Sequence, residues 1–216
     1  MKKEMQRRFF DVSLEARDDG EQGIISGKPI VYNRVADLGY FDEVILPGAL
    51  DNADLTDVRL CLNHDTSYVY ARSRRNNPNS TMQLKTASDG LDIEAHLNIE
   101  SSPKAQDFYS AVKRGDMDKM SFMFLVGDEE WENVESDHPL RKIRSIETVL
   151  EVSCVTFPAY EQTEINARSK EELESYLDSL ESEGVARSLE SDNCDEDTYK
   201  RDLELAKAKI RILGGI

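Results

Sequence analysis

The chain between residues 9 and 167 is dominated by short stretches in which hydrophobic and polar positions alternate. A period of two places the apolar side chains on one face of a β-strand, so we expect this region to be rich in strands. Residues 81–98 show the pattern on both sides of a Ser-Asp-Gly turn and predict a hairpin. Residues 24–32 combine β-branched residues with a glycine and a proline, which is typical of an edge strand or of a bulged strand.

One helix is predicted inside the strand-rich region. Ser102 is suited to cap its start, Pro103 suits its first position, and Gly115 is suited to end it. The apolar residues between them recur at the spacing i, i+3, i+4, i+7 of a buried helix face, namely Ala105, Phe108, Tyr109 and Val112. This helix leads directly into the apolar segment that begins at residue 119.

The character of the sequence changes after residue 167. Residues 168–216 carry 13 acidic and 8 basic side chains. Helical spacing of apolar residues returns at residues 173–180 and again at residues 203–210. We therefore expect one core domain over residues 1–167, followed by an acidic C-terminal tail with two amphipathic helices over residues 168–216.

Composition narrows the classes of partner. The formal net charge is -16 and the isoelectric point is near 4.6. Binding to a phosphate backbone depends on clustered lysine and arginine, so we expect no nucleic-acid partner. A membrane-spanning helix needs about 18 or more consecutive apolar residues. We find no such run, and the basic N-terminal residues are not followed by the apolar core of a signal peptide, so we expect no membrane partner.

The three cysteines, at positions 61, 154 and 194, are an odd number and form no CxxC pair. Neither a disulfide framework nor a zinc site is indicated, and we expect no metal and no cofactor. Free cysteines are typical of a reducing compartment, which favours a cytosolic protein.

Ser121 is the one small hydroxyl in the apolar segment 119–126, whose sequence is KMSFMFLV. Strand alternation places it on the face opposite to Phe122 and Phe124. A buried hydroxyl needs a partner. The residues leave two interpretations open, a structural serine bonded to a carbonyl or a nucleophile activated by a base.

His64 follows an alternating strand at residues 57–62. The alternation predicts that Val58, Leu60, Leu62 and His64 share one face. Such an imidazole is either a core histidine bonded to a backbone carbonyl or a general base. The other two histidines, His96 and His138, lie in polar surroundings and are expected at the surface.

Glu151 interrupts a long β-branched and apolar run at residues 147–160. A carboxylate in the middle of such a strand is costly unless a partner compensates its charge. A structural ion pair is one interpretation. The other is the acid that orients an imidazole in a nucleophile, base and acid triad.

Five short motifs, in order, resemble the prohead proteases of tailed bacteriophages, which are serine endopeptidases distantly related to the herpesvirus assemblins. They are residues 41–50 (FDEVILPGAL), 62–65 (LNHD), 90–91 (GL), 120–124 (MSFMF) and 150–160 (LEVSCVTFPAY). Each motif is short and degenerate, but the five together, in this order and spacing, are specific. The similarity covers roughly residues 9 to 167, which is most of the chain.

This resemblance implies a mainly β protein with α elements, of the α+β class, with a bent sheet or small β-barrel and flanking helices. It implies a serine endopeptidase that cleaves scaffolding segments of capsid proteins, and itself, during procapsid maturation. The expected partners are the major capsid protein with its scaffolding segment and a second copy of the chain. The expected location is the immature procapsid in the cytoplasm of the bacterial host.

Carried over to this sequence, the family's nucleophile falls on Ser121 and its base on His64. Glu151 fits the third position in the closing motif, whereas the herpesvirus relatives use a second histidine, for which His138 is the candidate. We favour Glu151, because its place in a strand requires a partner. Met123 departs from the pattern, which commonly has glycine two residues after the serine and so admits a closer approach of the backbone.

Two other functions are compatible with the sequence. One is a non-catalytic scaffolding or assembly protein of the procapsid, in which the acidic tail acts and Ser121 belongs to the core. The other is a cysteine protease that uses Cys61 or Cys154 with His64. Alternation places Cys61 opposite to His64 and Cys154 opposite to Glu151, which disfavours the cysteine hypothesis.

Overall fold

A computed structural model describes residues 5–10, 14–18, 23–156 and 170–180 of the chain. The chain divides into two compact units. The first unit comprises residues 1–34, 45–129 and 143–159, and the second comprises residues 35–44, 130–142 and 160–216. Each unit is described by itself below.

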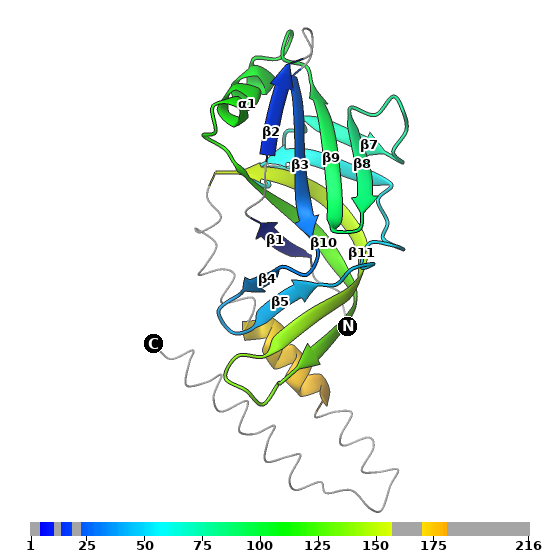
Figure 1. Cartoon of the computed structure of the whole chain (residues 1–216), viewed down its shortest axis with the longest axis vertical. Helices are drawn as coiled ribbons and strands as arrows, with labels where there is room; N and C mark the ends of the chain where they lie inside the picture. Colours follow the sequence, from blue (N-terminus) through cyan, green and yellow to red (C-terminus); the bar gives the residue numbers. More distant parts are fainter. Residues whose placement is uncertain (1–4, 11–13, 19–22, 157–169, 181–216) are drawn as a thin grey trace, which may run out of the picture. The chain divides into compact units, whose positions relative to one another are not determined.

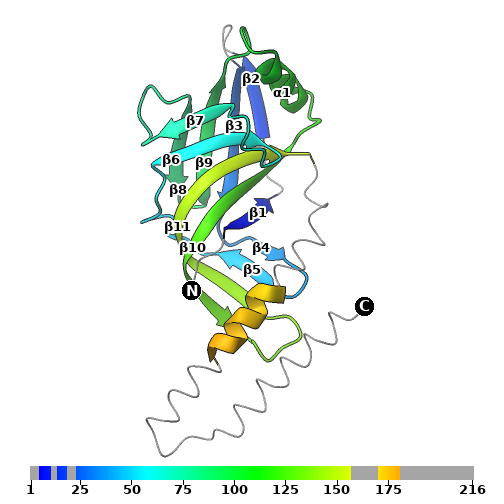
Figure 2. The same ribbon diagram turned by 180° about the vertical axis from the view of Figure 1, so that it is seen from behind.

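The first sheet of the first unit carries the predicted nucleophile strand. β1 (Gln6–Phe10) pairs antiparallel with β10 (Lys119–Glu132), and β11 (Leu140–Val155) is the next strand. β6 (Asp57–Leu62) pairs parallel with β11, and β7 (Ala71–Arg74) pairs antiparallel with β6. Figure 2 shows β10, β11 and β6 side by side in this sheet. β6, which is far away in sequence, therefore lies beside the consecutive strands β10 and β11.

The second sheet of this unit is antiparallel throughout. Its order is β2 (Leu14–Asp18), β3 (Gly23–Val31), β9 (Gly90–Leu97) and β8 (Met82–Ala87). The predicted hairpin over residues 81–98 is confirmed as β8 and β9. For residues 24–32 the structure selects the bulged strand of the two predicted alternatives, with a register shift after Gly27. The edge alternative does not apply, because β3 lies between β2 and β9. β2 is the edge strand on this side of the sheet, and the sequence pattern did not predict its pairing with β3.

The helix α1 (Pro103–Lys113) forms where the sequence predicted it (Figure 1). The Ser102 hydroxyl accepts a hydrogen bond from the Ala105 amide, and the predicted apolar face is buried. Gly115, with φ of 78°, follows the helix in a left-handed conformation that glycine adopts without strain. The helix and both sheets contribute side chains to one hydrophobic core. That core includes Ile25, Leu60, Phe108, Phe122 and Val152.

The second unit has its own small core. β4 (Val35–Asp37) pairs antiparallel with β5 (Asp42–Ile45), and a helix covers residues 170–180. Phe41 packs edge-on against Trp131 with ring centroids 4.7 Å apart, and Leu173 and Leu177 of the helix join the same cluster. Burial of these large apolar surfaces is what stabilises so small a core.

A buried ion pair accompanies this core. The Arg141 guanidinium donates to Glu43 at 3.1 Å and to Glu172 of the 170–180 helix at 2.7 Å. Of the predicted tail, the structure describes this helix alone, and it confirms the helical spacing at 173–180. The second predicted helix, at 203–210, lies outside the described residues. The division of the chain at residue 167 stays a prediction.

The expected fold class, mainly β with α elements, is confirmed. Within the described residues both sheets are open, so the bent-sheet form applies rather than a closed barrel. In the part of the chain that the structure describes, no helix has both the length and the apolar character needed to cross a membrane.

Candidate active site

The structure brings Ser121, His64 and Glu151 together in the first unit. The Nε2 atom of His64 lies 2.7 Å from the Ser121 hydroxyl oxygen, and the Nδ1 atom is hydrogen-bonded to the Glu151 carboxylate. Ser121 lies in β10, Glu151 in the adjacent β11, and His64 two residues beyond β6. The strand order, with β11 between β10 and β6, is what makes the three side chains meet.

Alternation along β10 sets the direction of Ser121, as predicted. Met120, Phe122 and Phe124 are fully buried in the hydrophobic core, so the residues between them point to the opposite face. The rings of Phe122 and Phe124 stack with centroids 4.8 Å apart and fix the strand on that side. Ser121 is itself only 2% exposed, although it lies on the face away from the phenylalanines.

The face predicted for His64 is wrong. β6 ends at Leu62, and Asn63 and His64 then adopt left-handed conformations with φ of 50° and 59°. These two residues turn the chain, so strand alternation no longer applies, and the imidazole points to the face of Glu151 instead of the face of Leu60. Asn63 is suited to this conformation, which its short polar side chain tolerates.

Asn63 also fixes the turn to β11. The backbone N–H of Asn63 donates to the Cys154 carbonyl at 2.9 Å, and its side-chain oxygen accepts from the backbone N–H of Thr156 at 2.9 Å. A left-handed conformation at a histidine costs energy and persists because the surrounding contacts hold it. Both bonds anchor the residue before His64, so they supply that support.

Glu151 has both carboxylate oxygens occupied. One oxygen bonds to the His64 ring, and the other accepts a hydrogen bond from the Ser153 hydroxyl at 2.6 Å. The Ser153 oxygen in turn accepts from the His64 backbone amide at 3.1 Å. Glu151 and Ser153 are both 2% exposed or less, so these bonds compensate a charge that water does not reach.

Ser153 is a site residue that the sequence interpretation missed. The signal that identifies it is its position two residues after Glu151, which places both side chains on one face of β11. Its hydroxyl links the carboxylate to the backbone of His64, so it positions both partners.

The hydrogen bonds of His64 determine which of its ring nitrogens carries the proton. With Glu151 ionised, the Nδ1 atom carries the proton, because a carboxylate accepts hydrogen bonds and does not donate them. The Nε2 lone pair then faces the Ser121 hydroxyl. This is the arrangement in which an imidazole takes a proton from a serine.

Ser121 has a further contact that the sequence did not predict. Its hydroxyl lies within hydrogen-bond distance of the Arg8 backbone carbonyl, at 2.8 Å. Arg8 belongs to β1, 113 positions away along the chain. No local sequence pattern links the two, because the contact depends on the pairing of β1 with β10.

The buried cysteines are poor nucleophiles. Cys61 pairs with Ser153 in the parallel ladder and so lies on the face of Glu151, contrary to its predicted separation from His64. Burial, with a smaller contribution from the Glu151 charge, raises the pKa of the Cys61 thiol from its ordinary 9.0 to about 11. Burial also raises the pKa of the Cys154 thiol. Since the thiolate is the nucleophilic form, both shifts disfavour a cysteine mechanism.

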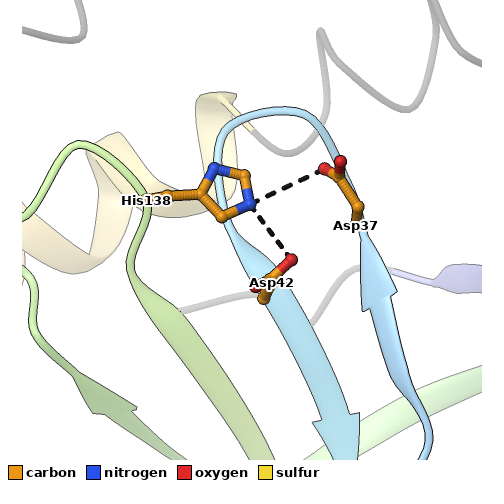
Figure 3. Close-up of side chains that lie close together, drawn as sticks. All are labelled: Asp37, Asp42 and His138. Carbon is orange, nitrogen blue, oxygen red and sulfur yellow. Dashed lines mark hydrogen bonds and ion pairs between the residues drawn. The ribbon is translucent and has the colours of Figure 1, made fainter.

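His138, the alternative third member of the triad, lies in the second unit. Its Nε2 atom is 3.0 Å from an Asp42 oxygen and 3.7 Å from an Asp37 oxygen (Figure 3). The ring is 39% exposed, as predicted for a surface histidine. His96 is part-exposed and bonds Glu94 at 3.2 Å. The carboxylate that contacts His64 is therefore Glu151.

His138 and the two carboxylates beside it lie close enough together to be compared with a metal site. One ligand atom from each of Asp37, Asp42 and His138 falls within 4.8 Å of the others. All three side chains are at least 36% exposed, and such groups commonly form surface ion pairs instead.

Met123, the departure from the family pattern, is half-buried in β10 and pairs with Arg7 of β1. Its side chain lies on the same face of β10 as Ser121. A methionine at this position therefore adds bulk on the face of Ser121, where glycine would add none.

Comparison with known proteins agrees with the geometry. The sequence model of a family described as caudovirus prohead serine protease matches residues 10–178. A curated prohead protease of Enterobacteria phage HK97 is 28% identical over 162 residues, which is 74% of this chain. The match spans 66% of that relative's length, slightly less than two thirds. No solved structure matches the chain.

Proposed function

Since the chain belongs to the caudovirus prohead serine protease family, we propose that it is a serine endopeptidase of procapsid maturation with Ser121 as nucleophile. The observation that supports this most strongly is the unbroken series of hydrogen bonds from the Ser121 hydroxyl through His64 to Glu151. A nucleophile, a base and an orienting acid in this order define the triad mechanism irrespective of fold.

The first half of the reaction forms an acyl-enzyme. The Ser121 oxygen attacks a peptide carbonyl carbon while its proton moves to the His64 Nε2 atom. The Glu151 carboxylate stabilises the imidazolium through the Nδ1 proton. Backbone N–H groups stabilise the negative oxygen of the tetrahedral intermediate. The imidazolium then protonates the leaving amine, and the peptide bond breaks.

The second half restores the enzyme. A water molecule gives a proton to the His64 Nε2 atom and attacks the acyl carbon. The ester bond to Ser121 breaks, and its oxygen recovers the proton from the imidazolium. The proposal includes no metal or cofactor.

The proposed substrates are the scaffolding segments of capsid proteins, with the protease itself as a further substrate. The proposed partners are the major capsid protein and a second copy of the chain, and the proposed place of action is the immature procapsid in the cytoplasm of the bacterial host. This part of the proposal follows from the family. The relative from phage HK97 is itself described as a prohead protease.

Intact mass spectrometry tests the function. The wild-type protein, the Ser121→Ala variant and a control Ser101→Ala variant are incubated alone and with the shell protein of the same phage. Ser101 is an exposed serine outside the site, so its variant controls for loss of a hydroxyl as such. We expect fragments from the wild type and from Ser101→Ala, and none from Ser121→Ala.

A different result has a clear meaning. If all three proteins and the shell protein stay whole under every condition, the endopeptidase proposal fails and the non-catalytic scaffolding alternative replaces it. If fragments also appear with Ser121→Ala, the nucleophile is another residue.

A further inference from the structure

The proposed nucleophile is closed off by its own chain. Ser121 is 2% exposed and His64 is 8% exposed. A peptide substrate must bring a carbonyl carbon to about 3 to 3.5 Å from the attacking oxygen. The described conformation leaves too little of Ser121 accessible for that, so part of the molecule has to move before a peptide reaches it.

β1 is the element that lies against the nucleophile. It pairs antiparallel with β10, and Phe9 is the Cα partner of Ser121 while Arg8 is the partner of Phe122. β1 is short, with five residues, and it lies at the end of the strand order of its sheet. An edge strand is the position at which an extended peptide from elsewhere adds to a sheet.

The contact between β1 and the nucleophile is a polar one. The Arg8 carbonyl oxygen lies 2.8 Å from the Ser121 hydroxyl oxygen, on which the His64 Nε2 atom also converges at 2.7 Å. A hydroxyl has one proton to donate. When that proton goes to the Arg8 carbonyl, it is not available to the base, so this hydrogen bond opposes activation of the serine.

β1 is thus bound as a substrate peptide would be, but its carbonyl is not oriented for attack by Ser121. It is extended, it runs antiparallel to the nucleophile strand, and it presents a peptide carbonyl to the attacking group. In a hydrogen bond the hydroxyl proton points at the carbonyl oxygen, whereas attack requires the hydroxyl oxygen to face the carbonyl carbon. The geometry is that of a pseudosubstrate.

We propose that the edge of β10 beside Ser121 is the peptide-binding site and that β1 occupies it as an internal pseudosubstrate. Substrate adds to β10 as an extended strand in place of β1, and its scissile carbonyl takes the position near Ser121 that the Arg8 carbonyl holds. The protein is therefore inactive until β1 is displaced. This inference rests on the proposed serine endopeptidase function.

The Arg8 side chain forms hydrogen bonds within β1 and also packs against β10. Arg8 is 8% exposed. Its guanidinium donates hydrogen bonds to the Arg7 carbonyl at 2.8 Å and to the Gln6 side chain at 3.2 Å. Its central carbon lies 6.0 Å from the centre of the Phe124 ring in β10. A buried guanidinium in contact with an aromatic ring contributes to packing as well as to charge.

A reversible cross-link tests the proposal directly. Arg7 and Met123 are Cα partners in the β1–β10 ladder and both are half-buried. Cα atoms of antiparallel partners are about 4.5 to 5.5 Å apart, within the range of about 4.4 to 6.8 Å that a disulfide spans. The double variant Arg7→Cys, Met123→Cys therefore fixes β1 on β10 when oxidised and releases it when reduced.

Two readouts are compared between the oxidised and reduced forms of this one protein. They are the rate at which a fluorophosphonate probe labels Ser121 and the rate of cleavage of the shell protein. We expect both rates to fall at least about 10-fold on oxidation, a barrier of about 1.4 kcal/mol, and to recover on reduction. The wild type, oxidised and reduced in the same way, controls for effects on the native cysteines.

The outcomes separate the two proposals. If the oxidised double variant labels and cleaves as fast as its reduced form, β1 does not cover the peptide site, and the pseudosubstrate proposal is overturned while the endopeptidase function stands. If neither form nor the wild type labels or cleaves, the endopeptidase function fails and the pseudosubstrate proposal fails with it.

A second variant tests the same proposal without a cross-link. Arg8→Ala removes the buried guanidinium and weakens the hold on β1, so we expect fluorophosphonate labelling to become at least about 3-fold faster. Arg17→Ala, on an exposed arginine of β2 outside the β1–β10 pair, is the matched control and should label at the wild-type rate. Circular dichroism melting of each variant shows that labelling is measured on folded protein. Equal rates for Arg8→Ala and the wild type would count against the proposal.

Discussion

Two of the contacts between a histidine and a carboxylate in the described residues, one in each unit, have sharply different surroundings. The side chains of His64 and Glu151 are 4% and 2% exposed, whereas those of His138 and Asp42 are 39% and 36% exposed. In the first unit the second ring nitrogen of His64 is hydrogen-bonded to the Ser121 hydroxyl, and the second carboxylate oxygen of Glu151 accepts a hydrogen bond from Ser153. In the second unit a single ring nitrogen, Nε2 of His138, lies near both Asp42 and Asp37.

The comparison shows that a histidine beside a carboxylate can lie in two very different environments. In water, such an ion pair is screened and contributes little. In a buried position every donor and acceptor has to be matched, so the network fixes the tautomer and direction of the ring. Of the two histidines compared, His64 alone has a serine hydroxyl, that of the proposed nucleophile Ser121, at its second ring nitrogen.

Removal of each imidazole is the strongest way to test this difference. His64→Ala takes away the proposed base, and we expect the rate of shell-protein cleavage to fall by at least about 10⁴-fold. His138→Ala should leave the rate within about 2-fold of the wild type, because the ring is half-exposed. Cleavage rates at saturating shell protein measure both effects. A large loss with His138→Ala would instead support the second histidine as the third member of the triad.

Neutralisation of each carboxylate is the next test. Glu151→Gln keeps the shape of the side chain but loses the acceptor that holds the Nδ1 proton, so the ring can adopt the wrong tautomer. We expect cleavage to fall by about 10³- to 10⁴-fold. The matched variant Asp42→Asn should change the rate by less than about 2-fold. If the two variants lose activity equally, burial is not what distinguishes the two contacts.

Ser153→Ala should have a smaller effect, because it removes a residue that positions the pair and does not touch the substrate. Loss of its hydroxyl leaves a buried carboxylate oxygen and the His64 amide without this partner, at a cost of about 1 to 3 kcal/mol. That cost corresponds to a fall of about 5- to 150-fold in kcat, with KM unchanged. Ser153→Thr keeps a hydroxyl and should restore part of the rate. A change in KM alone would contradict the positioning role.

The sequence predicted those parts of the site that depend on local pattern. Alternation identified the direction of Ser121, and the cost of an unpaired charge identified Glu151 as a residue that needs a partner. The face of His64 was not predictable by alternation, because Asn63 and His64 leave the strand with positive φ. The Arg8 contact and the pairing of β3 with β9 join distant segments, which no local pattern encodes.

The smallest expected effect concerns the thiol that shares the site with the proposed triad. Because the pKa of Cys61 is raised to about 11, its thiolate fraction at pH 8 is on the order of 10⁻³, against about 10⁻¹ for a thiol at the ordinary 9.0. Alkylation of Cys61 by iodoacetamide at pH 8 should therefore be at least about 100-fold slower than that of an ordinary thiol, and it should accelerate as the pH rises towards 11. Peptide mapping measures the modification at each cysteine, and the cleavage assay on the same sample measures activity. Cleavage should be unchanged by treatment at pH 8, because the proposed nucleophile is the Ser121 hydroxyl. A loss of activity in step with Cys61 modification would instead favour the thiol as the attacking group.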